Sequence, residues 1–178
     1  IGRILHFIRR KAMDIEGLSE KTAAQLYDQM DARDPADLYT LTMEQALALE
    51  GFKEKKAQKL LAALEKSKDC TLDCFLYAIG IPNIGRKTAR DLAAAFGTLE
   101  RVSDASAEAL TAIPDVGDIV AQSVTEFFSF PENRRMIDRL LAQGVKPREA
   151  DGRAEGVFSG MSVVVTGTLP NLSRKDAE

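Results

Sequence analysis

A nine-residue phrase, first written Ile15-Glu-Gly-Leu-Ser-Glu-Lys-Thr-Ala23, occurs four times along this chain. The later copies read Leu49-Glu-Gly-Phe-Lys-Glu-Lys-Lys-Ala57, Ile81-Pro-Asn-Ile-Gly-Arg-Lys-Thr-Ala89 and Ile113-Pro-Asp-Val-Gly-Asp-Ile-Val-Ala121. Successive copies begin 34, 32 and 32 residues apart. A period of this length indicates one supersecondary unit stacked on itself. The phrase predicts a tight turn that leads into a helix, made four times.

Apolar residues follow each phrase at steps of three and four, which is the spacing of one face of a helix. The first stripe is Ala23, Leu26, Tyr27 and Met30, and similar stripes begin at the last alanine of each later copy. A helix is also expected before each turn, over residues 2–11, 43–49, 72–79 and 105–112, with Thr42 and Ser103 as N-caps. The sequence thus predicts a mainly α-helical domain over residues 1–146 in which the arrangement helix, hairpin, helix occurs four times.

The composition changes near the end of the chain. Residues 147–156 carry charge, Pro and Gly with almost no apolar residue, which is typical of a linker. Residues 161–165 form a short β-branched run, and residues 172–176 resemble a cap entering a helix. Residues 157–178 therefore predict an incomplete α/β segment, too short to be a domain, and we expect the chain to be a fragment.

Composition excludes some classes of protein. The apolar share of 45% is ordinary for a globular protein. No apolar run is long enough for a membrane span and no signal peptide is visible, so we expect no membrane partner and a cytoplasmic location. The net charge of -3 argues against a polyanion ligand, but its distribution matters more than its sum. Five lysines and two acids lie between Gly51 and Lys66, whereas the fourth copy carries Asp115 and Asp118.

Histidine and cysteine are too sparse to indicate catalysis or metal binding. His6 is the only histidine and has no carboxylate or cysteine partner in sequence, so we interpret it as structural. Cys70 and Cys74 are separated by three residues, which is poor zinc spacing. We expect them to be reduced cysteines on a helix.

Three successive positions of the phrase specify the turn. The third position holds residues that tolerate positive φ, namely Gly17, Gly51, Asn83 and Asp115. The fourth is always apolar and should tuck the hairpin between its helices: Leu18, Phe52, Ile84 and Val116. The fifth is expected in the first turn of the following helix: Ser19, Lys53, Gly85 and Gly117.

Such a turn suits a phosphate. The first amides of a helix have no intrahelical acceptor, and the aligned peptides add about half a positive charge there. Basic side chains in the same turn add attraction, so we expect sequence-independent, salt-sensitive binding of the sugar-phosphate backbone. The residues predicted to contact DNA are Gly17, Leu18, Ser19, Lys21, Thr22, Gly51, Phe52, Lys53, Lys55, Lys56, Asn83, Ile84, Gly85, Arg86, Lys87, Thr88 and Gly117. Copies two and three are the better candidates, because the carboxylates of copy four repel phosphate.

The phrase resembles the helix-hairpin-helix motif, and four tandem copies resemble that domain of bacterial NAD-dependent DNA ligases. Supporting stretches are His6-Phe7, Arg10-Lys-Ala-Met-Asp-Ile15-Glu-Gly-Leu-Ser-Glu-Lys21, Asp37-Leu-Tyr39, Gly51-Phe-Lys-Glu-Lys55 and Gly80-Ile-Pro-Asn-Ile-Gly85. Phe158-Ser-Gly-Met-Ser-Val-Val-Val-Thr166-Gly-Thr-Leu169 and Leu172-Ser-Arg174 are similar to the start of a BRCT domain, which follows the hairpins in that family. The resemblance therefore implies a C-terminal fragment of such a ligase.

The resemblance implies an activity for the intact enzyme that this chain should not have alone. The family seals nicks in duplex DNA during replication and repair: a lysine attacks NAD, AMP passes to the 5′-phosphate, and the 3′-hydroxyl displaces it with magnesium. The adenylation motif Lys-x-Asp-Gly does not occur here. The catalytic domains and the cysteines of a zinc finger would lie upstream. The fragment itself is expected to bind no cofactor, and its partners would be nicked duplex DNA and the upstream domains.

Two departures from the family pattern and two rival functions remain. Ser19 and Lys53 replace the second hairpin glycine, and Lys53 should limit the closest approach of a phosphate at copy two. Thr166 and Gly167 lie where some BRCT domains hold a phosphate, but the rest of such a pocket is missing.

The rival functions are a helix-hairpin-helix module of another DNA repair protein, and a protein-interaction scaffold that binds no DNA.

Overall fold

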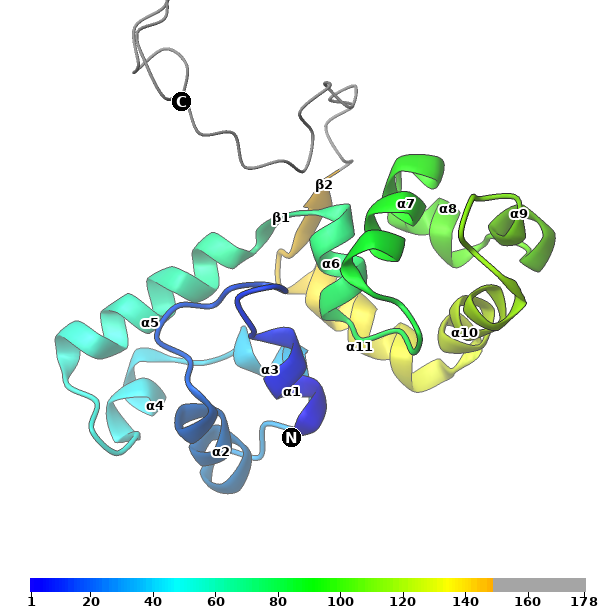
Figure 1. The fold of residues 1–178 in the computed structure, drawn as a ribbon. Helices are drawn as coiled ribbons and strands as arrows, with labels where there is room; N and C mark the ends of the chain where they lie inside the picture. The colour runs from blue at the N-terminus through cyan, green and yellow to red at the C-terminus, as the bar shows by residue number, and fades with distance from the viewer. Residues whose placement is uncertain (149–178) are drawn as a thin grey trace, which may run out of the picture.

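The computed structural model describes residues 1–148, which form helices around one hydrophobic core and two short strands. Figure 1 shows α1 to α5 gathered at one end of the molecule and α7 to α10 at the other, with α6 and α11 between them. Residues 149–156 of the predicted linker and all of the predicted BRCT-like segment, residues 157–178, lie outside the described residues. The predicted mainly helical fold is confirmed for the described part.

The four predicted units are present. The helices of each unit contact one another across the hairpin. The two units of the first half are α1 (Gly2–Phe7) with α2 (Glu20–Gln29), and α4 (Met43–Ala48) with α5 (Glu54–Ser67). Those of the second half are α6 (Leu72–Ala78) with α7 (Arg86–Phe96), and α9 (Ala107–Thr111) with α10 (Asp118–Ser129).

The alanine that ends each phrase is buried in all four units, which is one reason that the same residue occurs each time. Ala23, Ala57, Ala89 and Ala121 are each at most 1% exposed. A larger side chain at such a buried position would have to displace its neighbours, because protein interiors are close-packed. The apolar stripe that follows each alanine is buried as well, for example at Leu26, Leu60, Leu92 and Val124.

Three further helices connect the units and join the halves. They are α3 (Pro35–Leu38), α8 (Leu99–Ser103) and α11 (Pro131–Ala142). α11 packs on α10 of the second half and on α3 of the first. At the second contact, Arg139 pairs with Asp34 over 2.8 Å and also with Asp37. Ion pairs between α11 and the α3 region therefore connect the two halves.

A strand pair makes a second connection over a long distance in sequence. β1 (Asp69–Thr71) pairs in parallel with β2 (Lys146–Arg148), with Asp69 opposite Lys146. Arg148 Nε lies 2.5 Å from Asp69 Oδ1. Pro147 and Arg148, the first two residues of the predicted linker, thus belong to a strand.

Several predicted details are wrong at the ends of elements. The helix expected over residues 2–11 ends at Phe7, because the chain turns there and buries Ala12, Met13 and Ile15 in the core. Ser103 is the last residue of α8, and Ser106 instead caps α9 by accepting a hydrogen bond from the Ala109 amide at 3.2 Å. Thr42 is the N-cap of α4, as predicted, and forms a capping box with Gln45. No helix among residues 1–148 is long and apolar enough to cross a membrane.

Candidate nucleic-acid interface

The third position of every hairpin has the left-handed backbone that the sequence predicts. The φ angles are 84° at Gly17, 77° at Gly51, 62° at Asn83 and 64° at Asp115. Glycine reaches this region without steric cost, and Asn and Asp tolerate it better than other residues do. Each hairpin therefore reverses the chain through the same kind of residue.

The fourth position shapes the turn from inside. Leu18, Phe52, Ile84 and Val116 are at most 8% exposed. Their amides donate to the carbonyl of the first position of the phrase at 3.1 to 3.3 Å. The side chain of each residue is therefore buried, and its amide is hydrogen-bonded within the turn. Leu18, Phe52 and Ile84, which were predicted to contact DNA, thus pack the inside of the hairpin.

The fifth position is the N-cap of the following helix rather than part of its first turn, which corrects the prediction by one residue. The capping residues are Ser19, Lys53, Gly85 and Gly117. The carbonyl of each accepts the amide of the terminal alanine at 2.8 to 3.0 Å, which starts the helical ladder. All four capping residues are exposed.

The amides that follow each cap are the unsatisfied donors of the site. Within residues 1–148, no acceptor is found for the amides of residues 19–21, 53–55, 85–87 and 117–119. The helices that they begin are 10 to 14 residues long, so aligned peptide dipoles add positive potential at these ends. Three adjacent free N–H groups at an exposed helix start form an anion-binding arrangement.

Glycine at the cap of the third and fourth hairpins is not required by the fold. Gly85 and Gly117 have φ angles of -88° and -89°, which any residue adopts readily. An added Cβ would meet nothing within 4 Å at either position. Ser19 and Lys53 occupy the same position in the other hairpins with ordinary φ angles. The missing side chain therefore leaves open space above the free amides.

Basic side chains surround the hairpins, but some are already paired. Lys21 lies 3.2 Å from Glu50, and Lys87 lies 2.5 Å from Asp115 and 3.5 Å from Asp91. The hydrogen bond with Asp115 raises the pKa of Lys87 and lowers the pKa of Asp115. Lys53 and Lys55 make no ion pair within residues 1–148, and both side chains are exposed. The second hairpin consequently presents the most available positive charge.

Lys56, Arg86 and Thr88 are held by contacts within the protein. Lys56 Nζ lies 4.0 Å from the centre of the Phe52 ring and 3.5 Å from the Gly51 carbonyl oxygen. Arg86 donates to the Lys11 carbonyl and lies 4.0 Å from Asp73. Thr88 is half-buried on α7. These contacts orient the two cations close to the second and third hairpins.

The hairpins form two pairs with corresponding contacts. In the first pair, Gln25 Oε1 accepts the Glu50 amide at 2.6 Å, next to the ion pair of Lys21 with Glu50. In the second, Asn83 Nδ2 donates to Ser123 Oγ at 2.8 Å. Thr22 is 3% exposed and its amide donates to Ser19 Oγ at 3.2 Å. The side chains of Asn83 and Thr22 thus make hydrogen bonds within the protein, and the DNA contacts predicted for the two residues stay predictions.

His6 and the cysteines take no part in these hairpins. His6 Nε2 lies 2.7 Å from the Tyr77 carbonyl oxygen, so its role is structural as predicted. Cys74 lies on α6, but Cys70 lies in β1, which corrects the prediction of two cysteines on a helix. Burial raises the pKa of Cys70 to about 12, so its thiol is unreactive at neutral pH. No group of three or more potential metal-binding side chains of His, Cys, Asp or Glu occurs within residues 1–148.

Comparison with protein families assigns the class of these hairpins. Residues 10–66 match the family described as "SAM-like Helix-hairpin-helix tandem", and residues 74–137 match "Helix-hairpin-helix motif". Each match covers the two hairpins of one pair. Both pairs are thus of the helix-hairpin-helix type.

Known relatives then give the particular kind of protein that the chain is similar to. It is 50% identical over 179 residues to the DNA ligase of Alkaliphilus metalliredigens, covering 100% of this chain and 27% of the relative. It is 53% identical over 175 residues to the DNA ligase of Clostridium perfringens strain 13, covering 98% and 26%. The chain thus spans about a quarter of the length of these relatives. The resemblance to DNA ligases inferred from the sequence motifs is confirmed.

Proposed function

We propose that this chain binds duplex DNA around a nick, without regard to base sequence, as the helix-hairpin-helix part of an NAD-dependent DNA ligase. The observation that carries the proposal is the set of free, exposed amides at the start of α2, α5, α7 and α10. Such amides donate hydrogen bonds readily to phosphate oxygens. Because every nucleotide carries the same phosphate, contacts of this kind do not depend on the base.

The hairpins contribute unequally to the proposed interface. The second supplies Lys53 and Lys55, which are exposed and unpaired within residues 1–148. The third supplies the open space at Gly85, where a phosphate can approach the backbone closely. The fourth has the same open space at Gly117, but Asp115 and Asp118 stand beside it and oppose an anion. The second and third hairpins therefore provide most of the binding free energy.

The proposed cellular role follows from the relatives. The chain aligns with about a quarter of the length of proteins named DNA ligase, and about half of the aligned residues are identical. We place the NAD chemistry in other parts of such a protein, because these 178 residues contain no Lys-x-Asp-Gly tetrad. We place magnesium and zinc there as well, because residues 1–148 contain no group of three or more His, Cys, Asp or Glu side chains that could hold a metal ion. The chain by itself would bind nicked DNA and would not seal it. Its share in replication and repair would be to hold the duplex in place.

Salt dependence separates this proposal from a protein-interaction scaffold. Fluorescence anisotropy would measure the dissociation constant of a labelled nicked duplex at several KCl concentrations. Three to five phosphate contacts predict a slope of log K against log salt of about -3 to -4.5. Duplexes of different sequence should give the same constant within about twofold. A slope close to zero would instead support the scaffold.

A further inference from the structure

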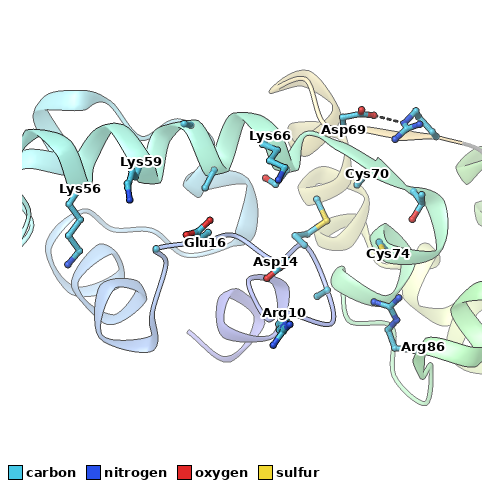
Figure 2. A pocket seen from close by; sticks show the side chains of 18 residues that line it. Arg10, Asp14, Glu16, Lys56, Lys59, Lys66, Asp69, Cys70, Cys74 and Arg86 are labelled. Carbon is cyan, nitrogen blue, oxygen red and sulfur yellow. Dashed lines mark hydrogen bonds and ion pairs between the residues drawn. The ribbon is translucent and has the colours of Figure 1, made fainter. Parts of the chain in front are cut away.

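A groove apart from the hairpin amides runs between α5 and the segment of residues 10–17. Its volume is about 990 Å³. Figure 2 shows Lys56, Lys59 and Lys66 following one another along α5, while Glu16 and Asp14 lie on the segment that faces them. We call this space the α5 groove. It borders the first and second hairpins at Gly17 and Lys56, and the third hairpin at Arg86.

The two walls of the α5 groove carry different sets of charges. On α5, Lys59 and Lys66 are exposed and make no ion pair within residues 1–148. On the facing segment, Arg10 is also exposed and without an ion pair in these residues, and Figure 2 shows it just below Asp14. Asp14 and Glu16 on the facing segment are likewise exposed and unpaired there. By contrast, Arg148 and Asp69, which also line the groove, neutralise one another at 2.5 Å. α5 thus offers only cations to the groove, whereas the facing segment offers two carboxylate acceptors beside Arg10.

The difference in charge between the two walls indicates which class of ligand fits the α5 groove. A duplex presents phosphates along both strands, and the hydrogen-bonding groups on the Watson–Crick edges of its bases are paired with one another. An unpaired DNA strand has one anionic edge, formed by its phosphates, and one neutral edge, where bases carry N–H donors that carboxylates accept. Grooves that bind single strands likewise follow the phosphates with basic side chains. The α5 groove matches the unpaired strand on both walls.

We propose that the α5 groove binds a short stretch of unpaired DNA, with phosphates toward Lys59 and Lys66 and base edges toward Asp14 and Glu16. Lys56 to Lys66 extends over ten residues of helix, or about 15 Å, which accommodates a few nucleotides. The proposal rests on the proposed function for the source of the strand, because a strand displaced at a bound nick can enter between hairpins. Of the residues predicted to contact DNA at the hairpins, the groove is lined only by Gly17, Lys56 and Arg86.

Charge reversal in the groove tests the proposal directly. The variant is Lys59→Glu with Lys66→Glu, and the matched control is Arg101→Glu with Arg135→Glu, which changes two exposed arginines outside the groove. The probe is a labelled oligothymidylate of about 12 nucleotides, within the range of single-strand sites. Anisotropy at fixed salt should show a loss of at least about tenfold for the groove variant and less than about threefold for the control. Circular dichroism confirms that both variants are folded.

A second pair of measurements separates the groove from the hairpins. The groove variant should bind a nicked duplex without a flap within about threefold of the original chain, whereas Gly85→Val should weaken that duplex and leave oligothymidylate binding unchanged. Equal losses on both probes in the groove variant would make the groove part of the duplex site and overturn the proposal. Unchanged oligothymidylate binding in the groove variant would overturn it as well. A third outcome would refute only the hairpin function. In that case the original chain would bind oligothymidylate but not nicked duplex, and the groove variant would lose oligothymidylate binding.

Discussion

The ammonium of Lys87 in the third hairpin lies 2.5 Å from the carboxylate of Asp115 in the turn of the fourth. Both side chains are exposed, at 71% and 77% of their full accessible area. The two residues lie 28 positions apart in sequence, and their pair links two successive hairpins. Because the carboxylate neutralises the lysine, the fourth hairpin weakens the attraction of the third for phosphate. An exposed pair of this kind contributes little to stability, so its main effect is on binding.

Asp115→Asn should therefore increase the affinity for nicked duplex. Asparagine tolerates the φ of 64° at this position, so the turn is retained. Lys87 then keeps only the longer pair with Asp91, so binding should tighten by about two- to fivefold and the salt slope should become steeper by up to about one unit. The measurement is an anisotropy titration at several salt concentrations. Asp28→Asn, at an exposed acid outside the hairpins, is the control, and an equal gain there would show that only net charge matters.

Gly85→Val tests whether the space above the third hairpin is used by the ligand. The φ of -88° suits valine, and its Cβ would meet nothing within 4 Å. Thermal unfolding should therefore show a loss of about 1 kcal/mol or less, while affinity for nicked duplex should fall by at least about tenfold. Gly85→Ser, which retains a good N-cap, should give a smaller loss. Full affinity in the valine variant would mean that no phosphate approaches these amides.

Lys55→Glu combined with Lys56→Glu tests the unequal use of the hairpins. Both residues lie in the first turn of α5, beside the free amides of the second hairpin. Reversal of both charges should weaken duplex binding by more than about tenfold and reduce the salt slope by about two units. Arg101→Glu combined with Arg135→Glu changes the net charge by the same amount elsewhere on the surface. Equal losses in the two double variants would contradict a local role for the second hairpin.

The contact of Asp37 with Arg139 predicts a dependence of stability on pH. Burial alone would raise the pKa of Asp37, but hydrogen bonds from the Asp34 amide, Arg139 and the Arg33 amide outweigh it and hold the pKa below its usual value. A carboxylate with a lowered pKa stabilises the fold above its ordinary pKa of 3.8, and that stability is lost as the pH falls through the lowered value.

Asp37→Asn should remove this dependence. At neutral pH the variant should lose about 1 kcal/mol of the free energy of unfolding, because the carboxylate that completes the capping box of α3 and pairs with Arg139 is gone. Between pH 6 and pH 3, urea unfolding should show a smaller decrease for the variant than for the original chain. Parallel decreases in the two proteins would assign the acid sensitivity to other groups.

The hairpins could be predicted from the sequence because each one depends on local chemistry. Only a few residues tolerate a left-handed backbone, so Gly17, Gly51, Asn83 and Asp115 mark the turns without any knowledge of the surroundings. The buried fourth position and the terminal alanine follow from the same repeat. The free amides then follow from the geometry of a helix start.

Contacts between distant segments could not be predicted in the same way. β1 and β2 are three residues each and lie far apart in sequence, so neither has a period that identifies it. The ion pairs of Arg139 with Asp34 and of Lys87 with Asp115 depend on how the hairpin pairs pack. The α5 groove was missed for this reason, since Arg10 and Lys66 are brought together only by the fold. The hydrogen bond of Asn83 with Ser123 could not be predicted either, because the two residues lie on different units.

The central claim is that backbone amides at the hairpins hold the phosphates, and amide NMR spectroscopy tests it most directly. A ¹⁵N-labelled chain would be titrated with a nicked duplex, and the shift and hydrogen exchange of each amide followed. The largest changes and the strongest new protection are predicted at residues 53–55 and 85–87, which have no acceptor within residues 1–148. Unchanged amides at all four helix starts, with shifts confined to other surfaces, would contradict the account.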